Sequence, residues 1–506
     1  MTNLRLKLAA SPAITMLLLT GCMVGPKYHA PSPSATATAP PVTYKESPTQ
    51  FQDTDGWKVA QPQDAMLHGK WWEIYGDPEL NTLEDKLNID NQNIRQFFEN
   101  FLEARTLVSQ ARSQLYPTVG VSLGYTRSQS SSNLTNSPTA NAGKVSGIGS
   151  LPFDVSWEPD LWGKVRNLIH EQQYNAQLSA ADLENEKLTE QASLAEFFFE
   201  IRGQDALQRI LNDTVEADRK ALELAKARYE TGVDDKISMV EAESTLESVQ
   251  SQAINLGVAR AQFEHAIAVL VGVNPSEFSI PVKPLLTTSP PIPVGMPSAL
   301  LERRPDIAAS ERKMAAANAQ IGIAYAAYYP SLDLSASGGF ESSNFSHFFN
   351  WPSRFWSIGP SLSETIFDAG LRRATVNQFI TTYNADVASY RQTVLTAFQQ
   401  VEDSMASVRI LSQQMIKQEQ AEKSSEEVLK LETARYETGV DPYLNVVTAQ
   451  TTLLSNQQTH ANLHVQQMTA SVQLIEALGG GWDRSQLPTP AQVSKKLDKA
   501  DTTIQK

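Results

Sequence analysis

The sequence predicts a mainly helical protein that also carries two short β-hairpins of the membrane type and is built twice from one module. The heptapeptide Ala227–Val233 recurs letter for letter as Ala434–Val440, 207 residues further along (434 − 227). Each half contains a long proline-free stretch, residues 160–274 and 361–441, which favours long helices. Segments in which apolar and small or polar residues alternate, the period of a β-strand, precede both stretches. A repeat of this size is a duplicated domain-sized module, not a solenoid unit.

Composition limits the functions that the chain can have. The 506 residues carry a formal net charge of −14 and contain no basic run, so we expect no nucleic-acid partner. The single cysteine excludes an intrachain disulfide and a cysteine-based zinc site. The sequence has no Gly-x-x-x-x-Gly-Lys phosphate loop and no Gly-x-Ser-x-Gly elbow, and His460 and His464 lack the glutamate of a zinc protease motif. We therefore predict that the protein is not an enzyme and has no catalytic residue, metal or cofactor.

The N-terminus is predicted to be an export signal that ends at Cys22. Arg5 and Lys7 precede an apolar stretch that is too short to span a bilayer. Its last residues, Leu19–Cys22, resemble a bacterial lipobox, in which the cysteine is acylated, as by palmitate, and becomes the first residue of the mature protein. Such acylation anchors a protein stably in lipid, and in lipoproteins of this kind Met23 favours the outer membrane. The alternative is an ordinary signal peptide that contains a chance cysteine.

Four segments alternate as transmembrane strands do, with apolar residues on one face and small or polar residues on the other. Each has about the ten residues that a tilted strand needs. One such segment alone could equally belong to a soluble sheet with one wet face, but four on a predicted lipoprotein favour a barrel. The polar loops that join them are predicted at 128–149 and 341–354. The segments themselves are residues 119–125, 151–157, 332–340 and 356–362.

Four strands cannot close a barrel, because the smallest known barrel has eight strands. Open sheet edges are not tolerated in lipid. If the strands span the membrane, the protein must therefore be an oligomer that pools them. Two chains would give eight strands around a filled lumen, whereas three would give twelve strands and room for a channel.

Each half continues as an antiparallel helical hairpin. We predict long helices over residues 164–231 and 371–438 and returning helices over about 237–271 and 443–478. Apolar residues along the second long helix recur with a mean spacing of about 3.5, the coiled-coil period, so neighbouring helices should supercoil. A helix of that length extends roughly 100 Å at 1.5 Å per residue, which suits a protein that crosses a compartment. Gly203 is the one weak point of the first long helix.

Several motifs together resemble the outer-membrane factors, the TolC-like efflux ducts, in their lipoprotein branch, which serves RND-type pumps. The resemblance covers Cys22 to about Trp482. It implies a homotrimer in which a twelve-stranded outer-membrane β-barrel is continued by a twelve-helix periplasmic α-barrel. It also implies a mixed equatorial domain, a belt formed by residues 45–76, 273–300 and the C-terminal stretch. The motifs are the lipobox with residues 23–28, Trp71–Leu80, Arg304–Ile307, the two Arg-Tyr-Glu-Thr-Gly tips and Ala449-Gln450.

This architecture divides the chain into consecutive segments. They are a signal peptide (1–21), a lipidated linker (22–48), an equatorial segment with the first helices (49–117), β-hairpin 1 (118–158), helical hairpin 1 (159–272), an equatorial linker (273–303), a helix that pairs with the second half (304–330), β-hairpin 2 (331–366), helical hairpin 2 (367–479) and a C-terminal equatorial tail (480–506).

The resemblance implies an exit duct that passes drugs or other toxic small molecules through the outer membrane of a Gram-negative bacterium, a basis for antibiotic resistance. A duct without a phosphate loop needs an external source of energy. The implied partners are a periplasmic membrane-fusion adaptor protein and an RND-type inner-membrane pump. Two alternatives stay open, the exit duct of a protein-secretion system and a periplasmic coiled-coil lipoprotein without a pore.

The tips of the helical hairpins are the predicted functional site. In the family the adaptor meets the tips, and the tips also contain the gate. We expect the adaptor to contact Arg228, Tyr229, Gly232, Val233, Gly439 and Val440.

The predicted periplasmic gate contains acidic residues, because a ring of carboxylates in a trimer selects for cations. Asp441 matches an acidic ring position of the lipoprotein branch, and Asp234 follows the other tip at the same place, with Asp235 beside it. Each could instead cap a helix, and Asp441 followed by a proline is a good N-cap. Tyr436 and Arg435 are predicted to bind Asp234 or Asp235 and so to keep the tip closed.

Overall fold

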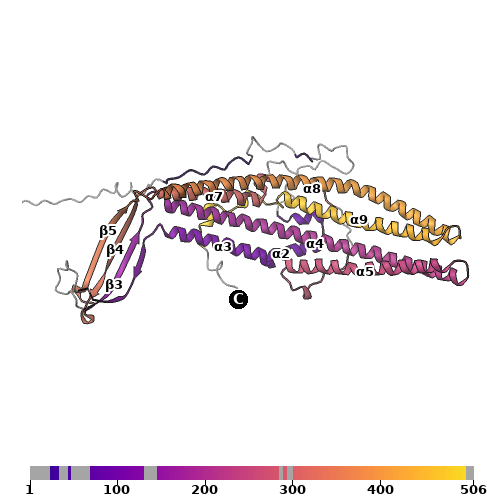
Figure 1. Ribbon diagram of the computed structural model, residues 1–506, viewed down its shortest axis with the longest axis horizontal. Helices are drawn as coiled ribbons and strands as arrows, with labels where there is room; N and C mark the ends of the chain where they lie inside the picture. The colour runs from indigo at the N-terminus through magenta and orange to yellow at the C-terminus, as the bar shows by residue number, and fades with distance from the viewer. Residues whose placement is uncertain are drawn as a thin grey trace, which may run out of the picture.

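The computed structural model describes residues 23–33, 44–46, 69–129, 131, 145–283, 289–292 and 300–496. The predicted signal peptide and the predicted lipidation site Cys22 lie outside these residues. The described chain is elongated, with a β-sheet at one end and the turns of two helical hairpins at the other (Figure 1). Among the helices described, none combines the length and the apolar character needed to cross a bilayer.

Strands and long helices occur twice along the chain, as the repeat predicts. The first half contains η3 (Trp71–Tyr75), α2 (Pro78–Asp90), α3 (Gln92–Ser113), β1 (Thr118–Val121), β2 (Gly124–Gln129), β3 (Val145–Trp157), α4 (Lys164–Glu230), α5 (Lys236–Leu270) and η4 (Pro275–Glu277). The second half contains α6 (Leu300–Arg303), α7 (Pro305–Ala326), β4 (Ser331–Ser342), η6 (Phe345–His347), η7 (Trp351–Ser353), β5 (Arg354–Ser363), α8 (Leu371–Glu437), α9 (Tyr443–Ala477), η8 (Arg484–Gln486) and α10 (Pro490–Val493).

The helices α4 and α8 are each continuous over 67 residues. Each begins directly after a glycine with positive φ, Gly163 (+79°) or Gly370 (+90°), a conformation that other residues rarely adopt. A carboxylate before each glycine accepts hydrogen bonds from amides of the first turn, at 3.0 and 3.1 Å for Asp160 and at 3.1 Å for Asp368. The ends predicted for both helices are confirmed to within one residue.

The shorter helices meet end to end at mid-length of the molecule. Asn91, which caps the start of α3, donates from Nδ2 to the carbonyl of Leu270 at the end of α5 (2.9 Å). Arg304, which precedes α7, donates to the carbonyl of Ala477 at the end of α9 (3.0 Å). These side chains satisfy carbonyls that have no partner within a helix C-terminus. The repeat does not predict the two joints, because Asn91 and Arg304 are unrelated residue types.

Gly203 lies inside an unbroken α4, where it allows a close approach to α9. A Cβ atom at this position would lie 2.2 Å from Cγ2 of Val465, which is buried. The glycine predicted to weaken the helix therefore serves the packing between the two halves.

We expect Gly203→Ala to lower the melting temperature of the detergent-solubilised protein. Overpacking a filled core costs about 1–3 kcal/mol, more than the roughly 1 kcal/mol that alanine contributes as a better helix former. The matched control is Gly257→Ala in α5, where a Cβ would have nothing within 4 Å. This control should raise the melting temperature slightly. Equal effects of the two substitutions in thermal denaturation would contradict the close contact with Val465.

The strands form one antiparallel sheet in the order β1/β2-β3-β4-β5. β1 and β2 both pair with β3 in one continuous register and are interrupted opposite Pro152, which has no N–H to donate. The loops between the strands are shorter than predicted. β2 continues to Gln129, β3 already begins at Val145 and β4 continues to Ser342. Hydrogen bonds between the strands extend each hairpin into residues whose polar side chains had favoured a loop.

The two faces of the sheet differ in character, as the alternation predicts. One cross-strand row contains Val119, Val155, Ala336 and Ile358, and the next row on that face ends at Trp356. On the opposite face, Thr118 and Ser156 share a hydrogen bond (2.7 Å), as do Ser331 and Ser363 (2.9 Å) and Ser337 and Asp154 (2.6 Å). Val119 and Ile358 are 72% and 76% exposed, so no described element of the same chain covers the apolar face.

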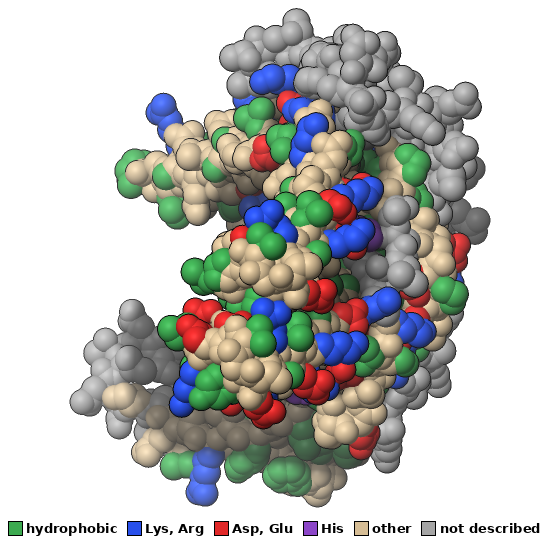
Figure 2. All heavy atoms as spheres, turned by 90° about the vertical axis from the view of Figure 1, so that its right-hand side faces the viewer, with side chains coloured by type: hydrophobic (Ala, Val, Ile, Leu, Met, Phe, Trp, Pro, Cys, Tyr) green, Lys and Arg blue, Asp and Glu red, His purple; other side chains and the backbone are tan. Residues whose placement is uncertain are grey.

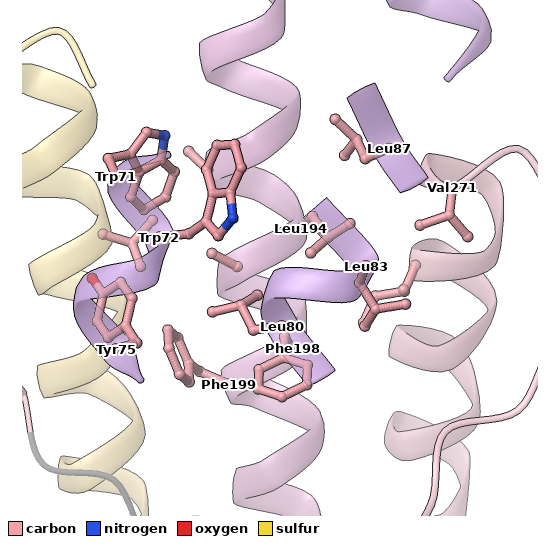
Figure 3. Packing of buried hydrophobic residues seen from close by; sticks show 14 of the residues in the cluster. Trp71, Trp72, Tyr75, Leu80, Leu83, Leu87, Leu194, Phe198, Phe199 and Val271 are labelled. Atoms are coloured by element: carbon pink, nitrogen blue, oxygen red, sulfur yellow. The ribbon is translucent and has the colours of Figure 1, made fainter. Parts of the chain in front are cut away.

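The largest core lies at mid-length, where the helix joints meet. Trp71 and Tyr75 of η3 and Leu80 of α2 pack against Leu194 and Phe199 of α4 (Figure 3). Asp77 starts α2 by accepting hydrogen bonds from the amides of residues 79 and 80 (2.8 and 3.3 Å), with a proline at the first helical position.

The C-terminal tail packs outside this central core. Gln177 of α4 donates to the carbonyl of Pro488 (2.8 Å), and Gln173 donates to Ser494 (2.9 Å). Val493 packs against Val108 of α3. The described part of the tail therefore runs along α3 and α4, between the central core and the sheet.

Candidate functional site

The two predicted tips have the same turn. After α4, the amides of Gly232 and Val233 donate to the carbonyls of Tyr229 (3.0 Å) and Arg228 (2.9 Å). After α8, the equivalent bonds are both 2.9 Å long. This pair of bonds is a Schellman motif, which needs a left-handed residue, and Gly232 has a φ of +70° and Gly439 one of +76°. The repeated heptapeptide thus specifies one helix-ending turn twice.

The structure brings Tyr436, Asp234 and Arg228 together, which joins the two hairpins. Tyr436 donates from its hydroxyl to Asp234 (2.8 Å), so the predicted contact between these residues is confirmed. The guanidinium of Arg228 lies over the Tyr436 ring, 4.8 Å from its centre, and 3.7 Å from the Asp234 carboxylate. Arg228 also donates to the carbonyl of Glu437 (3.2 Å). We call Arg228, Asp234 and Tyr436 the tip network.

The tip network shifts the pKa values of its members. Burial opposes ionisation of Asp234, but hydrogen bonds from Tyr436, the Asp235 amide and Ser238, together with Arg228, outweigh it and lower the pKa of Asp234. Burial and the hydrogen bond to Asp234 raise the pKa of the Tyr436 hydroxyl. Asp234 is therefore an ionised acceptor, and Tyr436 a neutral donor, throughout the neutral and mildly acidic range.

The acidic candidates have three different roles. Asp235 is the N-cap of α5 and accepts from the amides of Ile237 (3.0 Å) and Ser238 (3.2 Å). Asp441 is not a helix cap, contrary to one prediction, because Pro442 occupies the N-cap position and Asp441 forms an ion pair with Arg435. That pair lowers the pKa of Asp441. The predicted contact of Arg435 with Asp234 or Asp235 is therefore wrong, because Arg435 pairs with Asp441 instead.

The predicted contact residues differ in how accessible they are. Val233 and Val440 are 65% and 64% exposed. Tyr229 is also exposed, whereas Arg228 is largely enclosed by the tip network. Sequence reasoning missed Ile237 and Leu444, which are equivalent in the repeat and likewise exposed. Apolar residues at one repeated position just beyond each turn are the signal that could have identified them.

Seen from the tips, the described chain forms an arc around a hollow that opens to one side (Figure 2). Hydrophobic, acidic and basic side chains are mixed on the surface that faces the viewer. An elongated arc with an exposed apolar sheet at one end has the shape of a segment of a tube. A globular domain would instead enclose its apolar residues in one core. The fold and the tips thus define a channel-forming class of protein.

Comparison with known proteins supports this class. The family model described as "Outer membrane efflux protein" matches residues 86–273 and 296–480. The chain is similar to the antibiotic efflux pump outer membrane protein ArpC of Pseudomonas putida (29% identity over 474 residues, 93% of this chain and 95% of ArpC). It is also similar to OprJ of Pseudomonas aeruginosa (30% over 486 residues, 94% and 96%). Its fold is similar to that of the outer-membrane channel OprN (TM-score 0.81, 25% identity, 91% and 100%).

The chain belongs to the outer membrane efflux protein family. It is an outer-membrane exit duct of an efflux system, as the motifs indicated. The relatives favour this function over a protein-secretion duct and over a coiled-coil lipoprotein without a pore. A family of ducts agrees with the prediction that the chain is not an enzyme.

Proposed function

We propose that three copies of this chain close one duct, from a twelve-stranded barrel in the outer membrane to a gated helical tip in the periplasm, through which drugs and other toxic small molecules leave the cell. The observation that supports this most is that one chain has two open edges along its whole length. Neighbouring copies meet edge to edge.

The open edges of the sheet are β1/β2 and β5, which have no second strand partner among the described residues. In lipid each unpaired amide and carbonyl costs several kcal/mol, so a sheet with free edges is not stable there. Pairing β5 of one copy with β1/β2 of the next satisfies these groups. Three copies of four strands give the twelve strands that the family resemblance implies.

Toward the tips the helical edges are α5 and α8, since the helices pack there in the order α8-α9-α4-α5. Toward the sheet the edges are α3 and α8, since the order there is α8-α7-α4-α3. α5 and α8 each present an apolar stripe at helical spacing. On α5 the exposed apolar residues are Ile237, Val240, Ile254, Val258 and Val269, separated by 3, 14, 4 and 11 residues. On α8 the stripe contains Leu395, Ile410, Val428 and Leu431, separated by 15, 18 and 3 residues, while the exposed Leu371 and Ile416 lie off it. Because the two stripes lie on different elements, their contact is heterologous, and such a contact closes into a ring of three when each copy is rotated by a third of a turn from the last.

The described N-terminal residues support a lipid anchor at Cys22. The amide of Val24 donates to the carbonyl of Trp162 (3.0 Å), and the backbone of Met23 lies so close to Gly163 that a Cβ there would be 2.8 Å away. Trp162 stacks on Tyr329 at the junction of sheet and helices. The described chain that follows the predicted lipidation site thus begins at the junction of sheet and helices, where stacked aromatic rings suit a membrane interface.

At the opposite end, the tips are the proposed gate and adaptor contact. The exposed Tyr229, Val233 and Val440, with the turns at Gly232 and Gly439, offer a mixed apolar surface to a periplasmic adaptor. The tip network keeps neighbouring hairpins together, and Asp441 contributes a carboxylate to a cation-selective ring. Energy comes from an RND-type pump in the inner membrane.

Planar-bilayer conductance of the purified oligomer tests this function. We expect small, cation-selective openings in the wild-type protein and reduced selectivity for cations in Asp441→Ala, because the ring loses its carboxylates and the Arg435 guanidinium loses this partner. Asp213→Ala, at an exposed position of α4 away from the tip turns, serves as the charge-matched control and should leave selectivity unchanged. A monomeric mass by analytical ultracentrifugation, or a folded, inserted trimer that never conducts even when the tips are destabilised, would contradict the proposal.

A further inference from the structure

A buried carboxyl group lies beside the apolar cluster that contains Tyr436 of the tip network. Asp218 of α4 is 2% exposed, and neither of its carboxylate oxygens has a hydrogen-bond partner among the described residues. One turn on either side, Val215 and Leu222 belong to the apolar cluster that also contains Tyr436 and Tyr443. A carboxyl group in such surroundings is costly when it is charged.

The repeat supplies an internal comparison for this position. The residue equivalent to Asp218 in the second half is Ser425, 207 residues later. Ser425 is also buried, but it accepts a hydrogen bond from Asn456 (2.7 Å) and donates to the carbonyl of Ala421 (2.6 Å). The residue equivalent to Asn456 in the first half is Val249, which has no side-chain donor. The same fold position therefore holds a satisfied hydroxyl in one hairpin and an unsatisfied carboxyl in the other.

No cation balances the carboxyl group from the helices packed around this cluster. Burial raises the pKa of Tyr443 on α9, and the negative charges of Asp218 on α4 and Glu241 on α5 raise it further. On α8, Tyr436 belongs to the same cluster, and one carboxylate oxygen of Glu432, one turn before it, is buried without a hydrogen-bond partner among the described residues. On α4 itself, Arg219 is exposed and paired with Glu216, and Arg228 is engaged in the tip network. Burial raises the pKa of Asp218 to about 6.

We propose that Asp218 is a pH-sensitive switch of the duct, whose protonated form stabilises the closed tip and whose ionised form loosens it. The inference rests on the proposed gate at the tips. Opening separates the hairpins and gives the carboxylate water, so the open form has the ordinary pKa. A group that binds its proton more strongly in the closed form favours closure at low pH, and this preference is lost as the pH rises from about 4 to about 6.

The size of the effect follows from the two pKa values. Between about pH 5 and pH 7 the ratio of open to closed tips should rise on the order of tenfold, and less if water reaches Asp218 in the closed form. Asp234 does not contribute, because its lowered pKa keeps it ionised over this range. An acidified periplasm would thus shut the duct.

The test measures conductance of the full-length oligomer near pH 5 and pH 7 for the wild type, Asp218→Asn and Asp218→Ser. The serine variant carries the residue that the second half uses at this position. We expect the open probability of the wild type to rise about tenfold with pH and that of both variants to stay at the low value. Asp213→Asn, exposed on the same helix, should behave as the wild type.

Infrared difference spectra provide a readout that does not depend on a pore. The wild type minus Asp218→Asn spectrum should show a protonated carboxylic acid that disappears with a midpoint near pH 6. A carboxylate already ionised near pH 5 would overturn the proposal, and so would equal pH dependence of conductance in both variants. If the acid titrates as expected while no sample conducts at either pH, the result contradicts the proposed duct but leaves the raised pKa of Asp218 confirmed.

Discussion

Asp234→Ala should open the resting duct. The substitution removes the acceptor of the Tyr436 hydroxyl and the carboxylate beside Arg228, so the two hairpins keep the hydrogen bond from Arg228 to the carbonyl of Glu437 but lose their charged contact at the tip. A hydrogen bond to a charged group contributes about 1.5–3 kcal/mol, and about 1.4 kcal/mol already corresponds to a tenfold change in an equilibrium. We therefore expect the open probability in planar bilayers to rise at least tenfold, since three copies contribute.

Asp235→Asn is the matched control for this experiment. It removes a negative charge from the adjacent residue, but asparagine caps a helix as well as aspartate does. The control should conduct as the wild type. If Asp234→Ala and Asp235→Asn increase conductance equally, the loss of tip charge explains the effect and the tip network does not keep the duct closed.

Asp205→Ala should destabilise the protein strongly, and more than Gly203→Ala does. Asp205 is 2% exposed and accepts hydrogen bonds from Arg260 (2.7 Å) and from the amide of Lys283 (2.9 Å). It also lies 3.4 Å from Arg202, which forms an ion pair with Glu79 (2.7 Å). Removing one partner of such a network leaves buried charge uncompensated, at a cost of about 3–5 kcal/mol.

This network positions the chain that follows α5. Arg202 donates to the carbonyl of Pro281 (2.7 Å) and Arg260 to that of Ile280 (2.8 Å), so residues 280–283 lie against α4 at mid-length. Thermal denaturation in detergent, followed by circular dichroism, should show a large decrease in melting temperature for Asp205→Ala. Asp213→Ala breaks an exposed pair with Arg209 and should change little. Similar small decreases for both variants would contradict a structural role for the network.

The sequence alone determines the parts of this protein that depend on a few neighbouring residues. Proline-free heptads set the extent of α4 and α8, and alternation sets the two faces of the sheet. The heptapeptide with glycine at its sixth position encodes one Schellman turn at both tips. These features are local, because helix period, strand period and turn geometry are each read over one or two turns of chain.

Only the tertiary structure decides which copy of a repeated residue has a role. Tyr229 and Tyr436 occupy the same place in identical heptapeptides, yet Tyr229 is 42% exposed and Tyr436 only 2%. Asp441, which reads as a helix cap, binds Arg435 instead, and Asp218 is buried without the partner that its counterpart Ser425 has. The physical reason is that burial and pairing depend on which face of each hairpin meets the other hairpin. That contact forms between residues some 200 positions apart, and local periodicity does not encode it.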